Sequence, residues 1–426
     1  MLIFLSDIHL TDGSSGTEID PRAFQKFCSL LDIIIGKPSD TKIHNVEIVL
    51  LGDIFDVIRS DLWLRSENNN STNPIRPWSA PGDKDSAGWN LQTYAEEIVR
   101  KIINNPRNQE AIRYIKDFET HCADQGVNLL ISYLIGNHDW LINRYPSTRQ
   151  AIADFLGLTP PGYYVTNEFY YLRPFDSDGY PVFARHGDYY DPFNFEGDRN
   201  ASSLGDAIVI DLLNKFPTAV ANSPLGSDLD LIKQLKEIDN VRPLWEIPAW
   251  IQGLCLRHPG IESQMHDIWN RLVDDFCALC FVKQHQHWDL EEALRLSEDF
   301  SFEHLQKIAD SWIARKLMSN SDDYHAYAYK EWAMQQAQAR YVVYGHTHHA
   351  EQVPMDIMPP APGGVTEAIY FNTGTWRKVF EHTVYDSDSL EFIGWYVMTF
   401  LVFYLPGEKE VDREYEVWSA SLGYGS

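Results

Sequence analysis

Cysteine is scarce in this sequence, which has 5 cysteines among 426 residues. So few cysteines, odd in number, exclude the disulfide framework that holds together many small secreted proteins. The first residues, MLIFLSD, also lack the basic segment of a secretory signal peptide. We therefore expect a protein of the reducing cytoplasm.

Basic residues are also few, since the chain has 35 lysines and arginines but 61 aspartates and glutamates. The resulting formal charge of −26 repels nucleic acid and anionic membrane surfaces. A nucleic-acid partner is therefore not favoured. A phosphate-bearing substrate would meet the same repulsion unless local positive charge, such as bound metal ions, attracted it.

Long apolar runs are also missing. The longest, residues 392–405, is shorter than the about 20 residues that a membrane helix needs, and it is rich in aromatic and β-branched residues. It is expected to be a buried strand, and no transmembrane segment is predicted. A hydrophobic content of 44% with 23% charged residues is typical of a folded globular protein.

Short apolar runs with strand character alternate with helical patterns in the first part of the chain. The run LIFLS and residues 46–53 and 127–139 are strand-like, whereas residues 91–105 and 109–125 have helical apolar spacing. Continuous apolar strands indicate a sheet covered on both faces, which is typical of the α/β class. Polar residues follow each run, at the end where such sheets bind ligands.

The middle of the chain changes character at about residue 196. Helical spacing predominates up to about residue 340, including residues 290–300 and 303–318, and strand patterns then resume. We predict one domain made of residues 1–196 and 340–426, interrupted by a helical insertion at residues 197–339. The insertion could be a lid that selects the substrate, or it could only support the fold.

Some segments allow two interpretations. Residues 65–90 form a polar loop that is either disordered or the border of an active site. Residues 247–254 could grip an acyl chain, but internal packing is the expected role. Residues 277–287 hold cysteines and histidines at zinc-like spacing, and here too core packing is expected. Arg377 and Lys378 could meet substrate phosphate or could simply keep a strand edge soluble.

Polar residues that suit metal binding occur in clusters, each after a strand-like run. In chain order the clusters are SDIH (Asp7, His9), GDIFD (Asp53, Asp56), GNHD (Asn137, His138, Asp139), RHGD (His186, Asp188) and GHTH (His346, His348). Carboxylate, amide oxygen and imidazole together are typical ligands of borderline divalent ions such as Mn²⁺, Fe²⁺ or Zn²⁺. Side chains two residues apart on an extended or loop backbone point the same way, so both members of a DxH or HxH pair can face one centre, and we expect an extended segment for HxH.

The order and identity of these clusters resemble the calcineurin-like metallophosphoesterase superfamily, whose pattern is DxH, GDxx(D), GNH(D/E), H and GHxH. The sequence YFNTGTW at residues 370–376 is also similar to the NTG strand that follows the last ligands in that family. The resemblance covers residues 1 to about 196 and from about 340 onward, but not the helical segment between them. It implies a four-layer α/β/β/α sandwich, in which two mixed sheets are flanked by helices.

The resemblance also implies a centre of two divalent metal ions, Mn²⁺ first, with Fe or Zn as alternatives. One ion would be held by Asp7, His9, Asp53 and His348, and the other by Asp53, Asn137, His186 and His346. Asp53 would bridge the two ions. A hydroxide between them would attack the phosphoester directly, without a phospho-enzyme.

Roles for neighbouring residues follow from the same resemblance. His138 would be the general acid that protonates the leaving oxygen, and Asp139 would orient it through a hydrogen bond. The alternative is that His138 only positions the substrate. Asp56 and Asp188 would orient ligand imidazoles, while His349 is expected to be a bystander.

The motifs restrict the phosphoester only in part. Val57 and Ile58 stand where protein phosphatases of this type have Arg-Gly, and Asp56 stands where the DNA-repair nucleases have histidine. The clusters look more like the UDP-2,3-diacylglucosamine hydrolase group, although His138 stands where that group commonly has arginine.

We therefore expect an enzyme, a hydrolase of phosphodiester, pyrophosphate or monoester bonds in a phosphorylated small molecule or a lipid-linked substrate. The alternatives are a nucleotide or nucleic-acid phosphodiesterase or nuclease, and a non-catalytic scaffold on the same fold.

Overall fold

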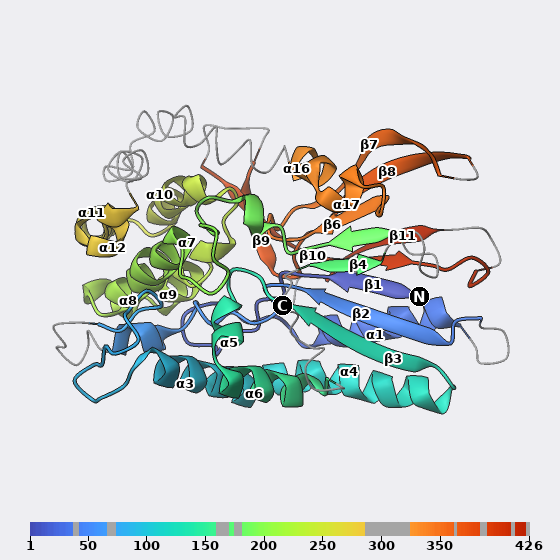
Figure 1. The fold of residues 1–426 in the computed structure, drawn as a ribbon. Coiled ribbons are helices and arrows are strands. Elements are labelled where there is room, and N and C mark those ends of the chain that lie inside the picture. The colour runs from blue at the N-terminus through green and yellow to red at the C-terminus, as the bar shows by residue number, and fades with distance from the viewer. Residues whose placement is uncertain are drawn as a thin grey trace.

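Two mixed β-sheets lie face to face at the centre of the protein (Figure 1). The structure is a computed structural model, and it describes residues 1–36, 42–65, 74–158, 170–173, 181–285, 324–361, 364–383, 390–409 and 414–422. The first sheet contains β1 (Leu2–Leu5), β2 (Asn45–Leu51), β3 (Asn128–Leu134), β9 (Lys378–His382), β10 (Phe392–Phe403) and β11 (Tyr415–Ser421). The second contains β4 (Tyr171–Arg173), β5 (Val182–Ala184), β6 (Tyr341–Tyr344), β7 (Ala350–Ala361) and β8 (Gly364–Thr373).

The strand order puts parallel strands in the middle of each sheet. The first sheet runs β11-β10-β1-β2-β3, with β1, β2 and β3 parallel, β10 antiparallel to β1, and β9 paired with β10. The second runs β4-β5-β6-β8-β7, with β5, β6 and β8 parallel. Because parallel strands end at the same edge, the loops after β1, β2 and β3 emerge together, as do those after β5 and β6.

The apolar runs of the sequence are explained by burial on both faces of the first sheet. Leu2 and Phe4 belong to the core between the two sheets, whereas Ile3 and Leu5 face the core beneath the helices. Successive side chains of a strand point to opposite faces, so both must be apolar when both faces are covered. The predicted strands near the start and at residues 46–53 and 127–139 are present as β1, β2 and β3.

Helices cover the outer faces of the sheets (Figure 1). The first sheet carries α1 (Arg22–Ile35), α3 (Leu91–Asn104), α4 (Pro106–Asp124) and α6 (Pro146–Leu156), and the second carries α16 (Tyr324–Lys330) and α17 (Trp332–Gln335). Asn90 begins α3 by accepting a hydrogen bond from the backbone N–H of Thr93, and Asn105 caps α4 ahead of its proline. The arrangement is α/β with two mixed sheets, and it is compatible with the four-layer sandwich expected above.

The middle of the chain is helical where it is described. It contains α7 (Leu204–Ile208), α8 (Lys215–Ala221), α9 (Leu229–Leu235), α10 (Ile247–Arg257), α11 (Glu262–Ala278) and α12 (Cys280–Gln284), joined by a π-helical segment at Val209–Asn214 and short 3₁₀ turns. These helices lie at the end of the molecule toward which β2 and β3 run (Figure 1). The predicted helices at residues 290–300 and 303–318 lie outside the described residues.

Three segments singled out in the sequence can now be placed. Ile247, Trp250 and Ile251 of α10 are buried, which confirms internal packing. In the loop at residues 65–90, Arg76 is buried and forms a two-pronged pair with Asp211 of the helical region, while residues 66–73 lie outside the described part. The strand expected at residues 392–405 is β10, but only its second half is fully buried. No described helix combines the length and apolarity needed to cross a membrane.

Candidate metal centre

The side chains expected to bind metal converge at the edge where the parallel strands end. Asp7 and His9 follow β1, Asp53 follows β2, Asn137 follows β3, His186 follows β5, and His346 and His348 follow β6. Groups from residues 7 to 348 thus meet in one place, and all seven side chains are at least nine-tenths buried. Buried groups of histidine and aspartate that could hold metal ions are present here.

One group consists of Asp7, His9 and His348. Nε2 of His9 lies 3.0 Å from Nε2 of His348, and these atoms lie 3.8 and 3.3 Å from Oδ1 of Asp7. This Oδ1 is buried, and no hydrogen bond reaches it from the described residues. A buried carboxylate oxygen without a donor, facing two ring nitrogens, is the arrangement that a shared cation would satisfy.

The second group consists of Asp53, His186 and His346, with Asn137 between them. Nε2 of His186 lies 3.1 Å from both Oδ2 of Asp53 and Oδ1 of Asn137. Nδ1 of His346 lies 3.0 Å from the same Asn137 oxygen. The amide is held in this orientation because its Nδ2 donates to Asn194.

Asp53, a member of the second group, also lies close to His9 of the first group. Its Oδ2 lies 3.1 Å from Nε2 of His186 and 3.8 Å from Nε2 of His9. Its Oδ1 accepts a hydrogen bond of 2.7 Å from the backbone N–H of His138. The carboxylate of Asp53 therefore lies between the two groups.

Hydrogen bonds on the far side of three rings fix how the imidazoles face the centre. Each ring has its outer nitrogen next to an oxygen: Asp56 Oδ2 for His9 (3.0 Å), the carbonyl of Leu51 for His186 (2.9 Å), and Asp191 Oδ2 for His346 (3.0 Å). An outer N–H that donates leaves the inner nitrogen with its lone pair, which is the form that binds metal. The role of Asp56 agrees with its prediction.

The predicted hydrogen bond between Asp139 and His138 is absent. Asp139 does not contact His138, because its carboxylate is occupied by the backbone N–H groups of Ile54 and Gly136 and by the hydroxyl of Tyr133. Asp56 takes its place, with Oδ1 lying 2.9 Å from Nδ1 of His138.

Asp188, expected to orient a ligand, pairs instead with the guanidinium of Arg199. The carboxylate that orients His346 is Asp191, which sequence reasoning missed although it lies in the same segment, HGDYYD.

The backbone is strained at most of the candidate ligands. Seven described residues other than glycine have positive φ, and five of them are Asp7, His9, Asp53, His346 and His348, with φ between 52° and 70°. The left-handed region is unfavourable for residues with a Cβ atom, so the surrounding structure must hold these residues there. The expectation of an extended HxH segment is therefore wrong, because His346 and His348 occupy a tight loop.

Gly52 allows β2 to end against His186. It has a φ of +84°, and a Cβ atom there would lie 2.6 Å from Cγ of His186. We expect Gly52→Ala to lower the free energy of unfolding by about 2–4 kcal/mol, from left-handed strain together with overpacking. It should also reduce metal content, because His186 must move. Thermal unfolding and elemental analysis measure the two effects.

Gly126→Ala is the matched control for this substitution. Gly126 has a φ of +76°, but nothing lies within 4 Å of the position of its Cβ. The control should cost only about 1 kcal/mol and leave metal content unchanged. Equal losses of stability in the two variants would show that contact with His186 is unimportant.

The charges of the centre shift its proton equilibria. Burial alone would lower the pKa of His186, but the carboxylates of Asp53 and Asp7 raise it to about 10. For Asp53, burial acts in the opposite direction to the neighbouring histidines, which lower its pKa below the usual value. A metal ion binding here must displace the proton from His186, so affinity for metal should fall as pH falls.

Other residues near the centre were not identified as one group from the sequence. Arg377 is buried, so its expected place on a soluble strand edge is wrong. It pairs with Asp239, and Arg242 of the helical region lies with Nη2 2.8 Å from Nδ1 of His348. Spacing could not have linked Arg377 to the other two, because Asp239 and Arg242 lie more than 130 positions before it.

The cysteines and histidines at zinc-like spacing in residues 277–287 form no further candidate metal site within the described part of the chain. Cys277 is buried in the helical core, as expected, whereas Cys280 is exposed. Residues 286 and 287 lie outside the described part.

Comparison of the chain with protein-family models, with curated proteins and with solved structures finds no match.

Proposed function

We propose that this protein is a metal-dependent phosphoester hydrolase with the four-layer fold of the calcineurin-like metallophosphoesterases. The observation that carries the proposal is the position of Asp53, whose Oδ2 lies near imidazoles of both candidate groups. Two cations sharing one carboxylate are suited to phosphoryl transfer, because they can stabilise both the attacking and the leaving oxygen.

The donor set fits two divalent ions. Imidazole, carboxylate and amide oxygen suit Mn²⁺, Fe²⁺ or Zn²⁺ better than Mg²⁺ or Ca²⁺, which prefer oxygen alone. Asp7, His9, Asp53 and His348 would hold one ion, and Asp53, Asn137, His186 and His346 the other. When bound, the ions would polarise the phosphoryl group and make an attacking water more acidic.

His138 is placed to supply a proton. Its Nδ1 is anchored to Asp56 at 2.9 Å, and 15% of its side chain is exposed, so the ring is fixed at one end and accessible elsewhere. Burial alone would lower its pKa, but the charges of Asp56 and Asp53 raise it to about 10. A protonated imidazole beside the centre can donate to the oxygen of a leaving group.

The test is metal content together with activity. The purified protein should contain a transition metal by elemental analysis and should hydrolyse bis-p-nitrophenyl phosphate with added Mn²⁺. A chelator should abolish the reaction, and Mn²⁺ should restore it. Absence of bound metal together with absence of turnover would reject the proposal and favour a non-catalytic scaffold.

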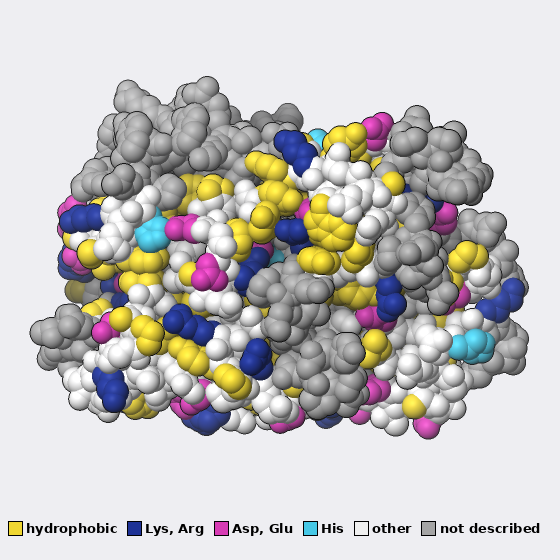
Figure 2. All heavy atoms as spheres, in the orientation of Figure 1, with side chains coloured by type: hydrophobic (Ala, Val, Ile, Leu, Met, Phe, Trp, Pro, Cys, Tyr) yellow, Lys and Arg dark blue, Asp and Glu magenta, His cyan; other side chains and the backbone are white. Residues whose placement is uncertain are grey.

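A substrate panel separates the remaining classes. Rates on the diester, on p-nitrophenyl phosphate, on UDP-sugars and on single-stranded DNA distinguish a phosphodiesterase, a monoesterase, a pyrophosphatase and a nuclease. We expect DNA to be the poorest substrate, because the chain has a net charge of −26. On the face drawn in Figure 2, the described lysines and arginines are interspersed with acidic and apolar side chains and form no continuous basic surface.

A further inference from the structure

Three arginines from separate segments contact one buried residue, Asp239, beside the metal centre. Oδ2 of Asp239, in the 3₁₀ turn Ile238–Asn240, lies 2.9 Å from Nη1 of Arg377 and 3.6 Å from Nε of Arg59. The backbone carbonyl of Asp239 accepts a hydrogen bond of 2.6 Å from Nη1 of Arg242. Arg59, Arg242 and Arg377 are called the arginine cluster below.

Within ion-pair distance the arginine cluster has fewer carboxylates than guanidinium groups, while Glu237 and Asp7 also act on it electrostatically. In the described structure, the carboxylates in ion-pair contact with it are Asp239 and Asp56, which lies 3.9 Å from Nη1 of Arg377. Asp56 is already bonded to two histidines of the centre, so its charge is shared. Burial, together with the neighbouring charge of Arg377, lowers the pKa of Arg59. An anion would relieve this repulsion.

Several donors of the arginine cluster are unused. Nη1 of Arg59 and both Nε and Nη2 of Arg377 are buried and have no hydrogen-bond partner among the described residues. Buried N–H groups without an acceptor are costly and uncommon in folded proteins. Guanidinium groups present such donors in a fork that matches the oxygens of phosphate or carboxylate.

Arg242 has a partner, His348, that it can exchange for an oxyanion. A guanidinium can only donate, so its contact with Nδ1 of His348 requires that nitrogen to accept. The proton of the neutral ring is then on Nε2, the atom that faces Asp7. A phosphate oxygen carries negative charge and is a stronger acceptor than the neutral imidazole nitrogen, so Arg242 can exchange this partner for an oxyanion.

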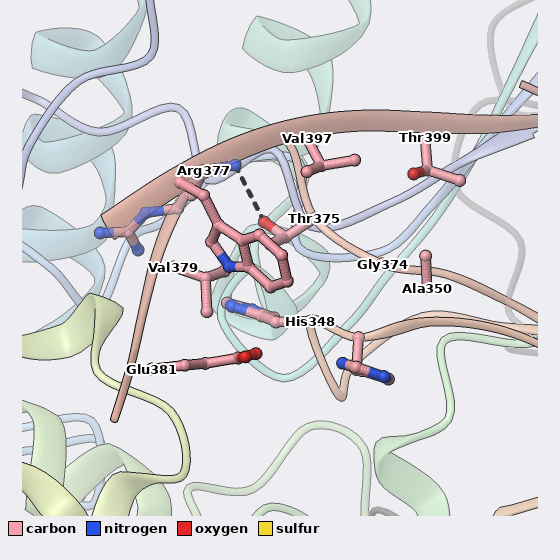
Figure 3. A pocket seen from close by; sticks show the side chains of 11 residues that line it. His348, Ala350, Gly374, Thr375, Arg377, Val379, Glu381, Val397 and Thr399 are labelled. Atoms are coloured by element: carbon pink, nitrogen blue, oxygen red, sulfur yellow. Dashed lines mark hydrogen bonds between the residues drawn. The ribbon is translucent and has the colours of Figure 1, made fainter. Parts of the chain in front are cut away.

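One member of the arginine cluster, Arg377, lines a cavity beside the metal centre. Arg377, Thr375 and His348 line part of a cavity of about 130 Å³, shown in Figure 3. The guanidinium group of Arg377 extends away from Val397 and Thr399 in this view, so its donors are turned from that wall and toward the cluster.

We propose that the arginine cluster binds an oxyanion of the phosphate type next to the metal centre, either a second phosphate group of the substrate or free phosphate. Arg377 and Arg242 donate hydrogen bonds to the oxyanion, and Arg59 adds positive charge. The unused donors and the guanidinium groups are present without metal, and only the assignment of the oxyanion to the substrate rests on the proposed function.

Binding of inorganic phosphate tests the site without catalysis. Titration calorimetry is carried out on the full chain with Asp53→Asn, in the presence of a chelator, so that the metal centre does not contribute. Phosphate should still bind, and adding Arg242→Gln or Arg377→Gln should weaken it at least about tenfold. Arg340→Gln, which removes a partly buried arginine paired with Glu414, should leave the affinity unchanged. Unchanged affinity in both cluster variants would overturn the proposal.

A purely structural role is distinguished by a second pair of variants. Arg377 is buried, so Arg377→Gln could lose phosphate binding by unfolding, whereas Arg242 is only partly buried and should fold after substitution. Arg377→Lys keeps the charge and should restore part of the affinity. A lower melting temperature without loss of phosphate affinity in Arg242→Gln would mean that the cluster only supports the fold.

The two sources of the oxyanion give different kinetics in the metal-loaded protein. If it is part of the substrate, Arg242→Gln should raise KM for a UDP-sugar at least about tenfold more than KM for bis-p-nitrophenyl phosphate. If it is free phosphate, the variant should change both KM values alike and lose the response of the rate to added phosphate. A wild-type protein without turnover would contradict the proposed function but not phosphate binding by the cluster.

Discussion

Asp53→Asn is expected to reduce kcat by at least about a hundredfold and to lower metal content toward zero. The amide removes the negative charge that lies 3.1 Å from His186 and 3.8 Å from His9, so both candidate ions lose their shared ligand. The side chain keeps its size, and the backbone N–H of His138 can still donate to an amide oxygen. Elemental analysis and turnover of bis-p-nitrophenyl phosphate measure the two losses.

Asp154→Asn is the control for the Asp53 variant, because Asp154 is an exposed aspartate on α6. It should retain full activity and metal content. A decrease in activity of less than about tenfold in Asp53→Asn would contradict a bridging role. Full metal content with low activity would instead place Asp53 among residues that act on the substrate.

His138→Ala is expected to leave the metal content unchanged and to slow hydrolysis in a way that depends on the leaving group. General acids contribute about 10²- to 10⁴-fold when the leaving oxygen needs a proton. Diphenyl phosphate should therefore lose about that much activity, whereas bis-p-nitrophenyl phosphate, whose leaving group is stable without a proton, should lose less than about tenfold. Rates across a series of substituted aryl diesters measure the dependence.

His121→Ala is the matching control, because His121 is an exposed histidine that contacts Asp32 on the outer helices. Its rates should equal those of the wild type on every diester. An equal loss on all leaving groups in His138→Ala would assign His138 to substrate positioning. Loss of metal would make it a ligand, which its distance to the centre also permits, since His9, Asp53 and His138 form a third candidate group.

The sequence predicted the strands and the loops that carry the candidate ligands because both signals are local. Ile3 and Leu5 pack under helices, and Leu2 and Phe4 pack between the sheets. Because both faces of this strand are buried, its residues form an uninterrupted apolar run in the sequence. Asp7 and His9 follow that run directly, and parallel strands must end at a common edge. The grouping of Asp7 with His348, across 341 positions, was implied by the family resemblance alone, because β1 and β6 belong to different sheets.

The partners of the ligands were decided by the tertiary structure. Asp139 follows His138 directly in the sequence, yet its carboxylate accepts a hydrogen bond from the backbone N–H of Gly136. The imidazole of His138 is oriented instead by Asp56, which follows β2. A hydrogen bond depends on distance and direction in space, which a neighbouring position in sequence does not guarantee.

The same holds for the arginine cluster. Arg59 comes from the loop after β2, Arg242 from the helical region and Arg377 from the segment between β8 and β9, and no spacing relates them. The local sequence pattern determined which residues follow each strand and hence which side chains could bind metal at the centre. The packing of the helical region against that edge decided which charges surround it, because only the folded chain brings Asp239 between the arginines.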